Sequence, residues 1–227
     1  MLIINNGVPK SGSSWIQTVL TRLYGLTGPS DPKWLRPWTN PSIDDAKLSG
    51  YLATGESSSR NVILKAHYRP KPELKKLFNH HGVKLLVSYR NMPDTIVSLY
   101  HHEKKHKKLD MSLAKWLASG GDIALRDYLS IRTGWQDMSL MIPFEEARND
   151  PALWAARIGE FIEVPPQQPV QKFCAQTLSR RTQVAESKHI RTGGAGAANE
   201  LPDYWRKVIE EIEAETLASQ LTSEKEC

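Results

Sequence analysis

Residues 2–15 read LIINNGVPKSGSSW, and this stretch predicts how the rest of the chain folds. Three apolar residues, 2–4, are typical of a short buried strand. A loop of small residues with one lysine follows, and then apolar residues recur at the spacing of a helix that Gly25 would end. They are Ile16, Val19, Leu20 and Leu23.

A strand that enters a small-residue loop and then a helix is suited to hold an anion. The backbone N–H groups of such a loop point inward, and the first turn of the helix adds partial positive charge. The opening stretch therefore predicts a phosphate site within the first fifteen residues.

Residues 7–12, which we call the phosphate loop, begin and end with glycine at the spacing of a nucleotide-triphosphate P-loop. That motif needs a lysine directly after the second glycine, to reach the β- and γ-phosphates, and then a Ser or Thr for magnesium. Ser14 matches the hydroxyl position, but Ser13 stands where the lysine should be, and Lys10 lies inside the loop. The loop therefore departs from that of a kinase or ATPase.

Composition sets broad limits on the protein class. A chain of 227 residues with 40% hydrophobic and 24% charged residues suits one globular α/β domain over residues 1–227. A net charge of +5 and a pI near 9.1 are compatible with a polyanionic ligand. The two cysteines, Cys174 and Cys227, form neither a disulfide framework nor a zinc pattern, which favours a reducing compartment.

No stretch of the sequence reads as a targeting or membrane segment. Met1 leads directly into the first strand, and no apolar run approaches the length of a membrane span. We therefore expect a cytoplasmic protein.

Strand and helix patterns alternate along the chain, which favours a mostly parallel, doubly wound sheet flanked by helices. A loop is expected over 28–50, and mostly irregular chain over 165–200. Further strands are expected at 61–65, 83–89 and 139–144. Helices are expected from about Leu74 to near Gly82, over 93–100, over 112–132 with a break at Gly120-Gly121, after Asp150 and from about Asp203.

Charged side chains follow two of these strands. Lys65 and His67 stand at the end of the second strand, and Arg90 follows the third. In open α/β sheets, ligands bind at the carboxyl ends of the strands. These side chains therefore stand where a ligand is expected to bind.

Several stretches resemble, in the same order, the motifs of sulfotransferases that use 3′-phosphoadenosine 5′-phosphosulfate (PAPS). The phosphate loop with the start of the helix is similar to the P-K-S-G-T-T-W loop of that family. The resemblance runs from about residue 2 to 199 and implies the P-loop NTPase-like sulfotransferase fold. The other matching stretches are 65–67 (family K-T-H), 89–100 (Y-R-N-P-x-D…S-x-Y), 143–161 (Y-E-D…D-P…F-L) and 191–196 (R-K-G-x-x-G).

The resemblance implies that PAPS is the sulfuryl donor and that 3′-phosphoadenosine 5′-phosphate (PAP) is the product. Arg90, Ser98 and the loop at 191–193 would bind the 3′-phosphate, and an arginine fork suits that role. Trp15 would lie near the adenine, and the serines after Lys10 would cradle the 5′-phosphosulfate. The implied cofactor-binding set is Lys10, Ser11, Gly12, Ser13, Ser14, Trp15, Arg90, Ser98, Phe144, Arg191, Thr192 and Gly193.

Three residues are implied in catalysis, and no metal is required. Lys10 would stabilise the bridging oxygen of the leaving group, and Lys65 the transferring sulfuryl group, as charge develops in the transition state. An acceptor hydroxyl, or less favourably an amine, needs a base, and His67 titrates near the right pH.

The sequence departs from the family pattern at several positions. Thr192 replaces a lysine, Phe144 a tyrosine and Ala66 a threonine, and the K-x-x-x-T-V-x-x-x-E dimerisation pattern is missing, so the oligomeric state stays open. The chain also lacks the N-terminal extension that encloses small substrates in larger relatives. We therefore hypothesise an open cleft for a glycan, lipid-linked or natural-product acceptor rather than a small phenol.

Other readings stay open at this point. The chain could be a small-molecule kinase, or a non-catalytic module that binds the 3′,5′-bisphosphate. The basic run at 101–108 favours a solvated helix end over a grip on an anionic acceptor or nucleic acid, and no nucleic-acid partner is expected. The Pro- and Trp-rich loop at 28–50 could line an acceptor pocket or pack on the core.

Overall fold

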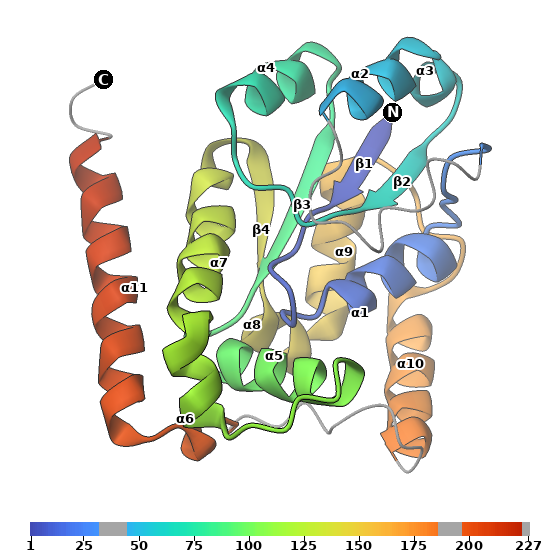
Figure 1. Cartoon of the computed structure of the whole chain (residues 1–227). Coiled ribbons are helices and arrows are strands. Elements are labelled where there is room, and N and C mark those ends of the chain that lie inside the picture. Colours follow the sequence, from blue (N-terminus) through green and yellow to red (C-terminus); the bar gives the residue numbers. More distant parts are fainter. Residues whose placement is uncertain (32–44, 186–196, 224–227) are drawn as a thin grey trace.

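The computed structural model describes residues 1–31, 45–185 and 197–223, and at its centre lies a four-stranded sheet (Figure 1). The strand order is β2-β1-β3-β4, and every neighbouring pair is parallel. The expected mostly parallel sheet is therefore confirmed, and β1 and β3 are its two inner strands. The strands are β1 (Leu2–Asn5), β2 (Val62–Lys65), β3 (Lys84–Tyr89) and β4 (Ser139–Pro143).

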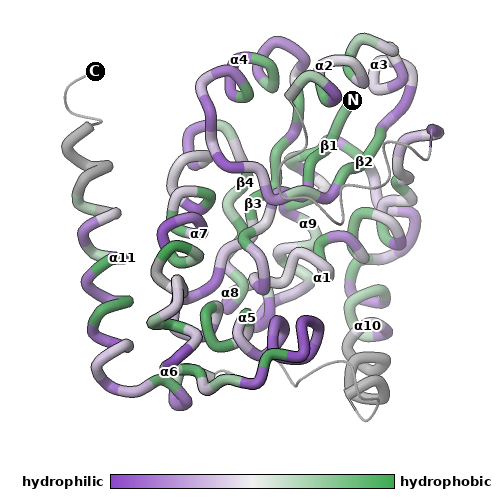
Figure 2. The backbone as a smooth tube through the Cα atoms, viewed as in Figure 1, coloured by the Kyte–Doolittle hydropathy of each residue, from purple (hydrophilic) through white to green (hydrophobic). Residues whose placement is uncertain are grey.

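Successive strand residues point to opposite faces of the sheet, and both faces are buried. Ile4 and Leu85 belong to one hydrophobic core, whereas Ile3 and Leu86 belong to a second core on the other face. This double burial explains why the strands are apolar runs without polar alternation, which Figure 2 shows as hydrophobic colour along β1 and β3.

Helices cover both faces, as a doubly wound fold requires. Figure 1 shows α7 in front of the sheet and α9 behind it. Helices α4, α5, α7 and α11 supply residues to the first core, and α1, α9 and α10 to the second. The helices are α1 (Ser13–Thr18, continued by a π-helical turn Val19–Leu23), α2 (Asp45–Ala53), α3 (Glu56–Ser59), α4 (Pro72–His80), α5 (Met92–His106), α6 (Leu113–Trp116), α7 (Asp122–Gly134), α8 (Phe144–Asn149), α9 (Pro151–Ile162), α10 (Val170–Ala185) and α11 (Asp203–Ser223).

Local signals in the sequence behave as expected at several helix ends. The backbone of Gly120 has φ 125°, which breaks the helical stretch before α7. The carboxylate of Asp150 accepts a hydrogen bond of 3.0 Å from the Leu153 N–H and caps α9. All four apolar residues expected on the inner face of the first helix are buried.

Two expectations of irregular chain were wrong. Helix α10 occupies much of the stretch from 165 to 200, and α2 begins within the expected loop at 28–50. Among the described side chains of α10, only Phe173 and Cys174 are buried, so the helix shows a weak apolar stripe after a proline-rich entry. The tryptophans Trp34 and Trp38 lie outside the described residues.

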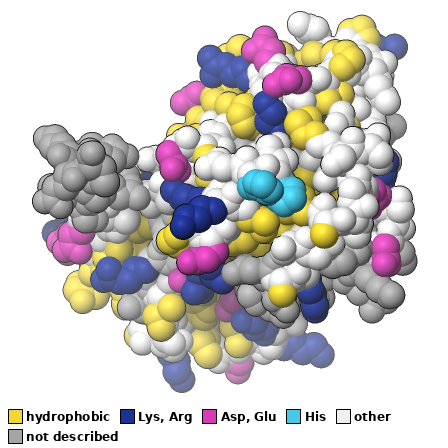
Figure 3. All heavy atoms as spheres, turned by 90° about the horizontal axis from the view of Figure 1, so that it is seen from above, with side chains coloured by type: hydrophobic (Ala, Val, Ile, Leu, Met, Phe, Trp, Pro, Cys, Tyr) yellow, Lys and Arg dark blue, Asp and Glu magenta, His cyan; other side chains and the backbone are white. Residues whose placement is uncertain are grey.

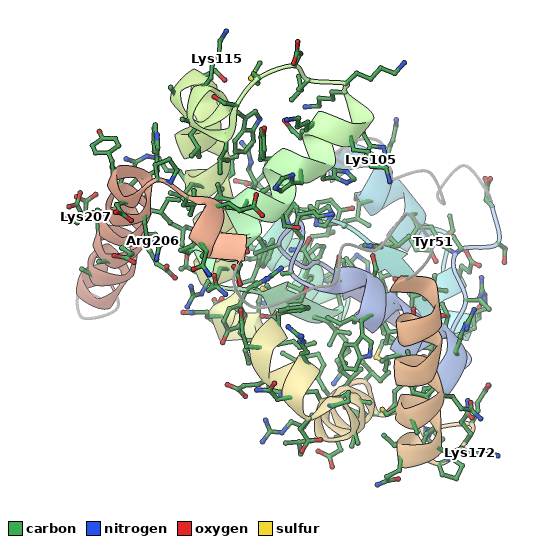
Figure 4. The ribbon with its side chains drawn as sticks, turned by 90° about the horizontal axis from the view of Figure 1, so that it is seen from below. Tyr51, Lys105, Lys115, Lys172, Arg206 and Lys207 are labelled. Atoms are coloured by element: carbon green, nitrogen blue, oxygen red, sulfur yellow. The ribbon has the colours of Figure 1, made fainter. Side chains whose placement is uncertain are left out.

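The parallel strands end at one edge of the sheet, next to the phosphate loop and α5. That edge is at the bottom of Figure 1, and Figure 4 views it from below, with Lys105 on α5 and Lys172 on α10 far apart. The opposite end, seen from above in Figure 3, carries positive and negative side chains interspersed. Within the described ranges, no helix combines the length and the apolar character that crossing a bilayer demands.

Candidate functional site

The two glycines of the phosphate loop stand where a larger side chain would not fit. Gly12 has φ 90°, and a Cβ at this position would lie 2.7 Å from the Phe144 ring. A Cβ on Gly7 would lie 2.0 Å from the Ser88 Oγ. Lys10 also has a positive φ, 67°, although it is not glycine. The loop is therefore a tight, strained turn between β1 and α1.

Buried serines anchor this loop to the end of β3. The Ser11 Oγ lies 2.7 Å from the Ser88 Oγ, 2.8 Å from the Ser88 carbonyl oxygen and 2.5 Å from the Val8 carbonyl oxygen. The Val8 N–H donates to the same Ser88 carbonyl at 2.7 Å. The hydroxyl of Ser11 is thus bonded within the protein, whereas Ser14 is exposed on the first turn of α1.

Lysines converge on this loop from two elements. The Lys65 Nζ, at the end of β2, donates to the Ser14 Oγ at 3.1 Å. Burial lowers the pKa of Lys65, and the charge of Lys10 lowers it further. Burial and the charge of Arg90 likewise lower the pKa of Lys10. Three basic groups thus act on one another at the edge of the sheet, which is the arrangement expected of a site for an anion.

Arg90 is buried at the start of α5 and is held from two sides. Its Nη2 donates to the Asp94 Oδ2 at 2.9 Å, and its guanidinium lies 4.8 Å from the centre of the Phe144 ring. Ser98, one helical turn beyond Asp94, is half-buried on α5. The guanidinium of Arg90 is therefore fixed in place near the phosphate loop.

Asp94 organises the backbone around Arg90. Its carboxylate also accepts hydrogen bonds from the Asn91 side-chain amide at 3.1 Å and the Ala198 N–H at 2.8 Å. Asn91 in turn caps α5 by accepting from the Asp94 N–H at 2.9 Å. The backbone at Ala198 is thus held by the same carboxylate that binds Arg90. Arg191, Thr192 and Gly193, expected at the 3′-phosphate, lie outside the described residues.

His67 follows β2 and faces the phosphate loop. Its Nδ1 makes a hydrogen bond to the Gly7 carbonyl oxygen. Since a carbonyl only accepts, Nδ1 carries the proton in the neutral ring, and Nε2 is left as the basic nitrogen. Burial, and to a lesser degree the charge of Lys65, lower the pKa of His67 despite the Gly7 bond, so the ring is neutral at neutral pH.

His67 lies at the wall of a cavity of 560 Å³. Most of the cavity wall is apolar and comes from α5, α6 and α7 and the segment between α5 and α6. The apolar lining residues are Pro9, Leu99, Leu109, Met111, Trp116, Ala124 and Ile131.

The charged side chains in the cavity wall are paired with one another. Arg69 donates to Asp127 at 2.5 Å, and Lys107 donates to Glu103 at 2.8 Å. Tyr128 also lines the cavity, and burial together with Glu103 and Asp127 raises the pKa of its hydroxyl, which stays protonated. The cavity wall is therefore mostly apolar, and its charges are balanced. The basic residues Lys10, Lys65 and Arg90 are not part of this wall.

The aromatic residues of the expected cofactor set lie on the other side of the phosphate loop. Trp15 is 8% exposed and packs in the second core. Together with Gly12, Phe144 and Arg148 it lines a narrow hollow next to the loop. Arg148 was not foreseen from the sequence, because an arginine in the last turn of a short helix reads as solvated.

Buried asparagines are the site residues that sequence reasoning missed. Asn5 and Asn6 are both 0% exposed, at the end of β1. The Asn5 side-chain amide donates to the Ser13 carbonyl at 2.8 Å, and Asn6 bonds the backbone of Tyr68. Two asparagines directly after a buried apolar strand were the available signal, because buried amides need partners.

The geometry so far defines an α/β protein with a tight loop after its first strand, on which Lys10, Lys65 and Arg90 converge. Among the described residues, no group of three or more His, Cys, Asp or Glu side chains could hold a metal ion. The family model of the sulfotransferase domain matches residues 2–207, and the chain belongs to this family.

Named relatives agree with this assignment. Sulfotransferase 2B1 of Mus musculus is 26% identical over 171 residues, which cover 69% of this chain and 48% of the relative. Cytosolic sulfotransferase 13 of Arabidopsis thaliana is 24% identical over 175 residues, covering 70% and 53%. The chain thus spans about half the length of the curated relatives it matches.

Solved structures share the fold. Mouse sulfotransferase SULT7A1 complexed with PAP superimposes with a TM-score of 0.66 at 17% identity, over 96% of this chain and 84% of the other. A sulfotransferase from Alicyclobacillus acidocaldarius gives a TM-score of 0.54 at 16% identity, over 95% and 92%. The sulfotransferase fold expected from the sequence is therefore confirmed.

Proposed function

We propose that this chain binds PAPS and transfers its sulfuryl group to an acceptor hydroxyl, leaving PAP as product. The observation that carries the proposal is the convergence of Lys10, Lys65, Arg90 and His67 on the phosphate loop. The residues fit the donor, because lysines and an arginine suit phosphate and sulfate oxygens. The PAP in the mouse structural neighbour is consistent with this ligand.

The three basic residues have separate roles in the proposal. Arg90, held by Asp94 and lying over Phe144, presents the fork for a phosphate. Lys10 and Lys65 stabilise the negative charge that develops on the leaving and transferring oxygens. PAPS supplies the activated sulfuryl group, so that no metal is needed in this scheme.

His67 is the general base of the proposal. Its Nε2 is the basic nitrogen, and its lowered pKa keeps the ring neutral and ready to take the proton of the acceptor hydroxyl. The ring lines the 560 Å³ cavity, so that an acceptor in the cavity has access to this residue.

The cavity supports a compact, largely apolar alcohol or phenol as the acceptor. A volume of 560 Å³ suits a small molecule, and the paired charges of the wall offer few free partners to a sugar. This differs from the expected open cleft for a glycan, lipid-linked or natural-product acceptor. Helices α5 and α7, with the segments between them, supply most of the cavity wall.

Calorimetric titration with PAP, beside ATP with magnesium, tests the donor. We expect metal-independent binding of PAP that Arg90→Ala abolishes and that Arg126→Ala, an exposed arginine on α7, leaves intact. Binding of ATP-magnesium without PAP would instead establish the kinase reading. PAP binding without sulfuryl transfer to any phenol or apolar alcohol would leave a bisphosphate-binding module.

A further inference from the structure

We propose that Asn6 is a positioning residue that fixes the ring orientation and the tautomer of His67. The inference rests on the proposed function, in which His67 is the general base. It concerns a side chain that touches neither the cavity nor the phosphate loop's anion site. Its effect passes through the backbone of residue 68.

The contact between Asn6 and Tyr68 resembles one rung of a strand ladder. The Asn6 Nδ2 donates to the Tyr68 carbonyl at 3.1 Å, and the Asn6 Oδ1 accepts from the Tyr68 N–H at 2.5 Å. Asn6 is 0% exposed, so water does not compete for these bonds. Both polar atoms of one side chain are thus used to hold one residue of the opposite segment.

These two hydrogen bonds lie just beyond the last residue pair of β1 and β2. The register pairs Asn5 with Lys65, and the last backbone bond runs from the Ala66 N–H to the Asn5 carbonyl at 3.0 Å. Asn6 extends the pairing by side chain to Tyr68, and His67 lies between these two anchors. The main chain on both sides of the histidine is therefore held.

A second buried side chain supports the same point. The Trp135 Nε1 donates to the Tyr68 carbonyl at 2.9 Å, and Trp135 is itself fully buried against Phe78. The Tyr68 carbonyl thus accepts two hydrogen bonds, one from the residue that follows β1 and one from the residue that follows α7. Loss of the Trp135 bond should loosen the backbone next to His67. Loss of the two Asn6 bonds should loosen it more.

The consequence for His67 follows from the neighbouring contact. Consecutive residues Asn6 and Gly7 bind consecutive residues Tyr68 and His67, because the Gly7 carbonyl accepts from Nδ1. If the backbone at residue 68 rotates, this Nδ1 bond is lost, and both tautomers become accessible. A fraction of the rings then carry the proton on Nε2 and cannot accept one from the substrate.

The test compares Asn6→Ala and Trp135→Phe with Thr133→Val, which removes a buried hydrogen bond of 2.7 Å within α7, away from His67. The ¹⁵N resonances of the His67 ring report its tautomer without any substrate. We expect a shift from pure Nδ1–H toward a mixture in Asn6→Ala, a smaller shift in Trp135→Phe and none in Thr133→Val. With substrates, kcat should fall about 100-fold in Asn6→Ala while the KM for PAPS stays within about twofold.

The outcomes separate the inference from the proposed function. An unchanged His67 spectrum in Asn6→Ala, or a kcat no lower than that of Thr133→Val, overturns the positioning role. If Asn6→Ala does not fold, Trp135→Phe decides by the same two measurements, since it keeps an aromatic ring in the core. If the wild type transfers no sulfuryl group, the proposed function fails, and the tautomer spectra still decide whether Asn6 holds His67.

Discussion

The Nζ of Lys65 lies 3.1 Å from the Oγ of Ser14, although 51 residues separate them in sequence. This hydrogen bond joins the carboxyl end of β2 to the first turn of α1. It holds the lysine over the end of the phosphate loop, next to Lys10, whose charge lowers the pKa of Lys65. A bound anionic group would replace the serine hydroxyl as the partner of this ammonium.

Replacing Lys65 should therefore reduce the rate of transfer more than it reduces donor binding. We expect Lys65→Ala to lower kcat by about 10²–10³-fold, because one preorganised donor to a developing charge is removed. Lys75→Ala, which removes a surface lysine paired with Asp137, is the matched control and should leave kcat unchanged. Steady-state kinetics check this, and a change confined to KM would contradict the role of Lys65 in the transition state.

Binding of PAP should take up protons at alkaline pH. Burial and neighbouring positive charge lower the pKa values of Lys10 and Lys65 in the free protein. Phosphate groups bring opposite charge, which raises both pKa values, so that the complex binds more protons than the free protein. Calorimetry in two buffers of different ionisation enthalpy measures the uptake. Lys10→Met should reduce it, and proton release on binding would contradict the prediction.

The fold was predictable because its main signals are local. The strands are apolar runs, and Ile16 and Leu20 repeat at helical spacing, so both patterns survive without knowledge of their neighbours. Helix α10 was missed because its burial depends on Phe173 and Cys174 meeting residues of the second core. Tertiary packing of a weakly patterned segment leaves little trace in its own sequence.

The site was predictable only in part, for a related reason. Residues at strand ends, such as Lys65 and Arg90, gather because the topology brings parallel strand ends together. The bond of Asn6 to Tyr68 joins a side chain to a backbone 62 residues away, which no spacing encodes. Likewise the spacing of Trp116 and Tyr128 carries no chemical code, although both residues line the cavity.

The acid limb of the pH–rate profile should lie below the ordinary pKa of histidine, 6.5. Burial, and then the charge of Lys65, lower the pKa of His67, so the base stays neutral and active as the pH falls through that ordinary value. Activity is lost only when the pH passes the lowered pKa. The profile of kcat/KM for the acceptor checks this, with His67→Asn as the inactive reference. An acid limb above 6.5 would contradict the assignment.

Asp94→Asn should destabilise the protein at neutral pH but not in acid. Burial alone would raise the pKa of Asp94, but hydrogen bonds from Asn91 and Ala198 and the charge of Arg90 bring it below its ordinary value. The carboxylate therefore contributes stability above its unfolded-state pKa, and this contribution disappears as the pH falls through the lowered folded-state value. Urea unfolding should show a loss of about 2 kcal/mol at neutral pH. An equal loss in acid would mean that the charge of Asp94 is not involved.

Filling the cavity should weaken acceptor binding and leave PAP binding intact. Ala124 lines the cavity, and Ala124→Leu places added carbon atoms in the space that the acceptor would occupy. We expect the KM of the best acceptor from a panel of phenols and apolar alcohols to rise about tenfold, since a hydrophobic pocket discriminates by that much per added methylene. The affinity for PAP should stay within about twofold, because Ala124 is not one of the residues proposed to bind the donor. Ala175→Leu makes the same change on the exposed face of α10 and should alter neither value. If Ala124→Leu leaves the KM of every acceptor unchanged, acceptors bind outside the 560 Å³ cavity, and the open surface beside His67 becomes the place to look for a larger substrate.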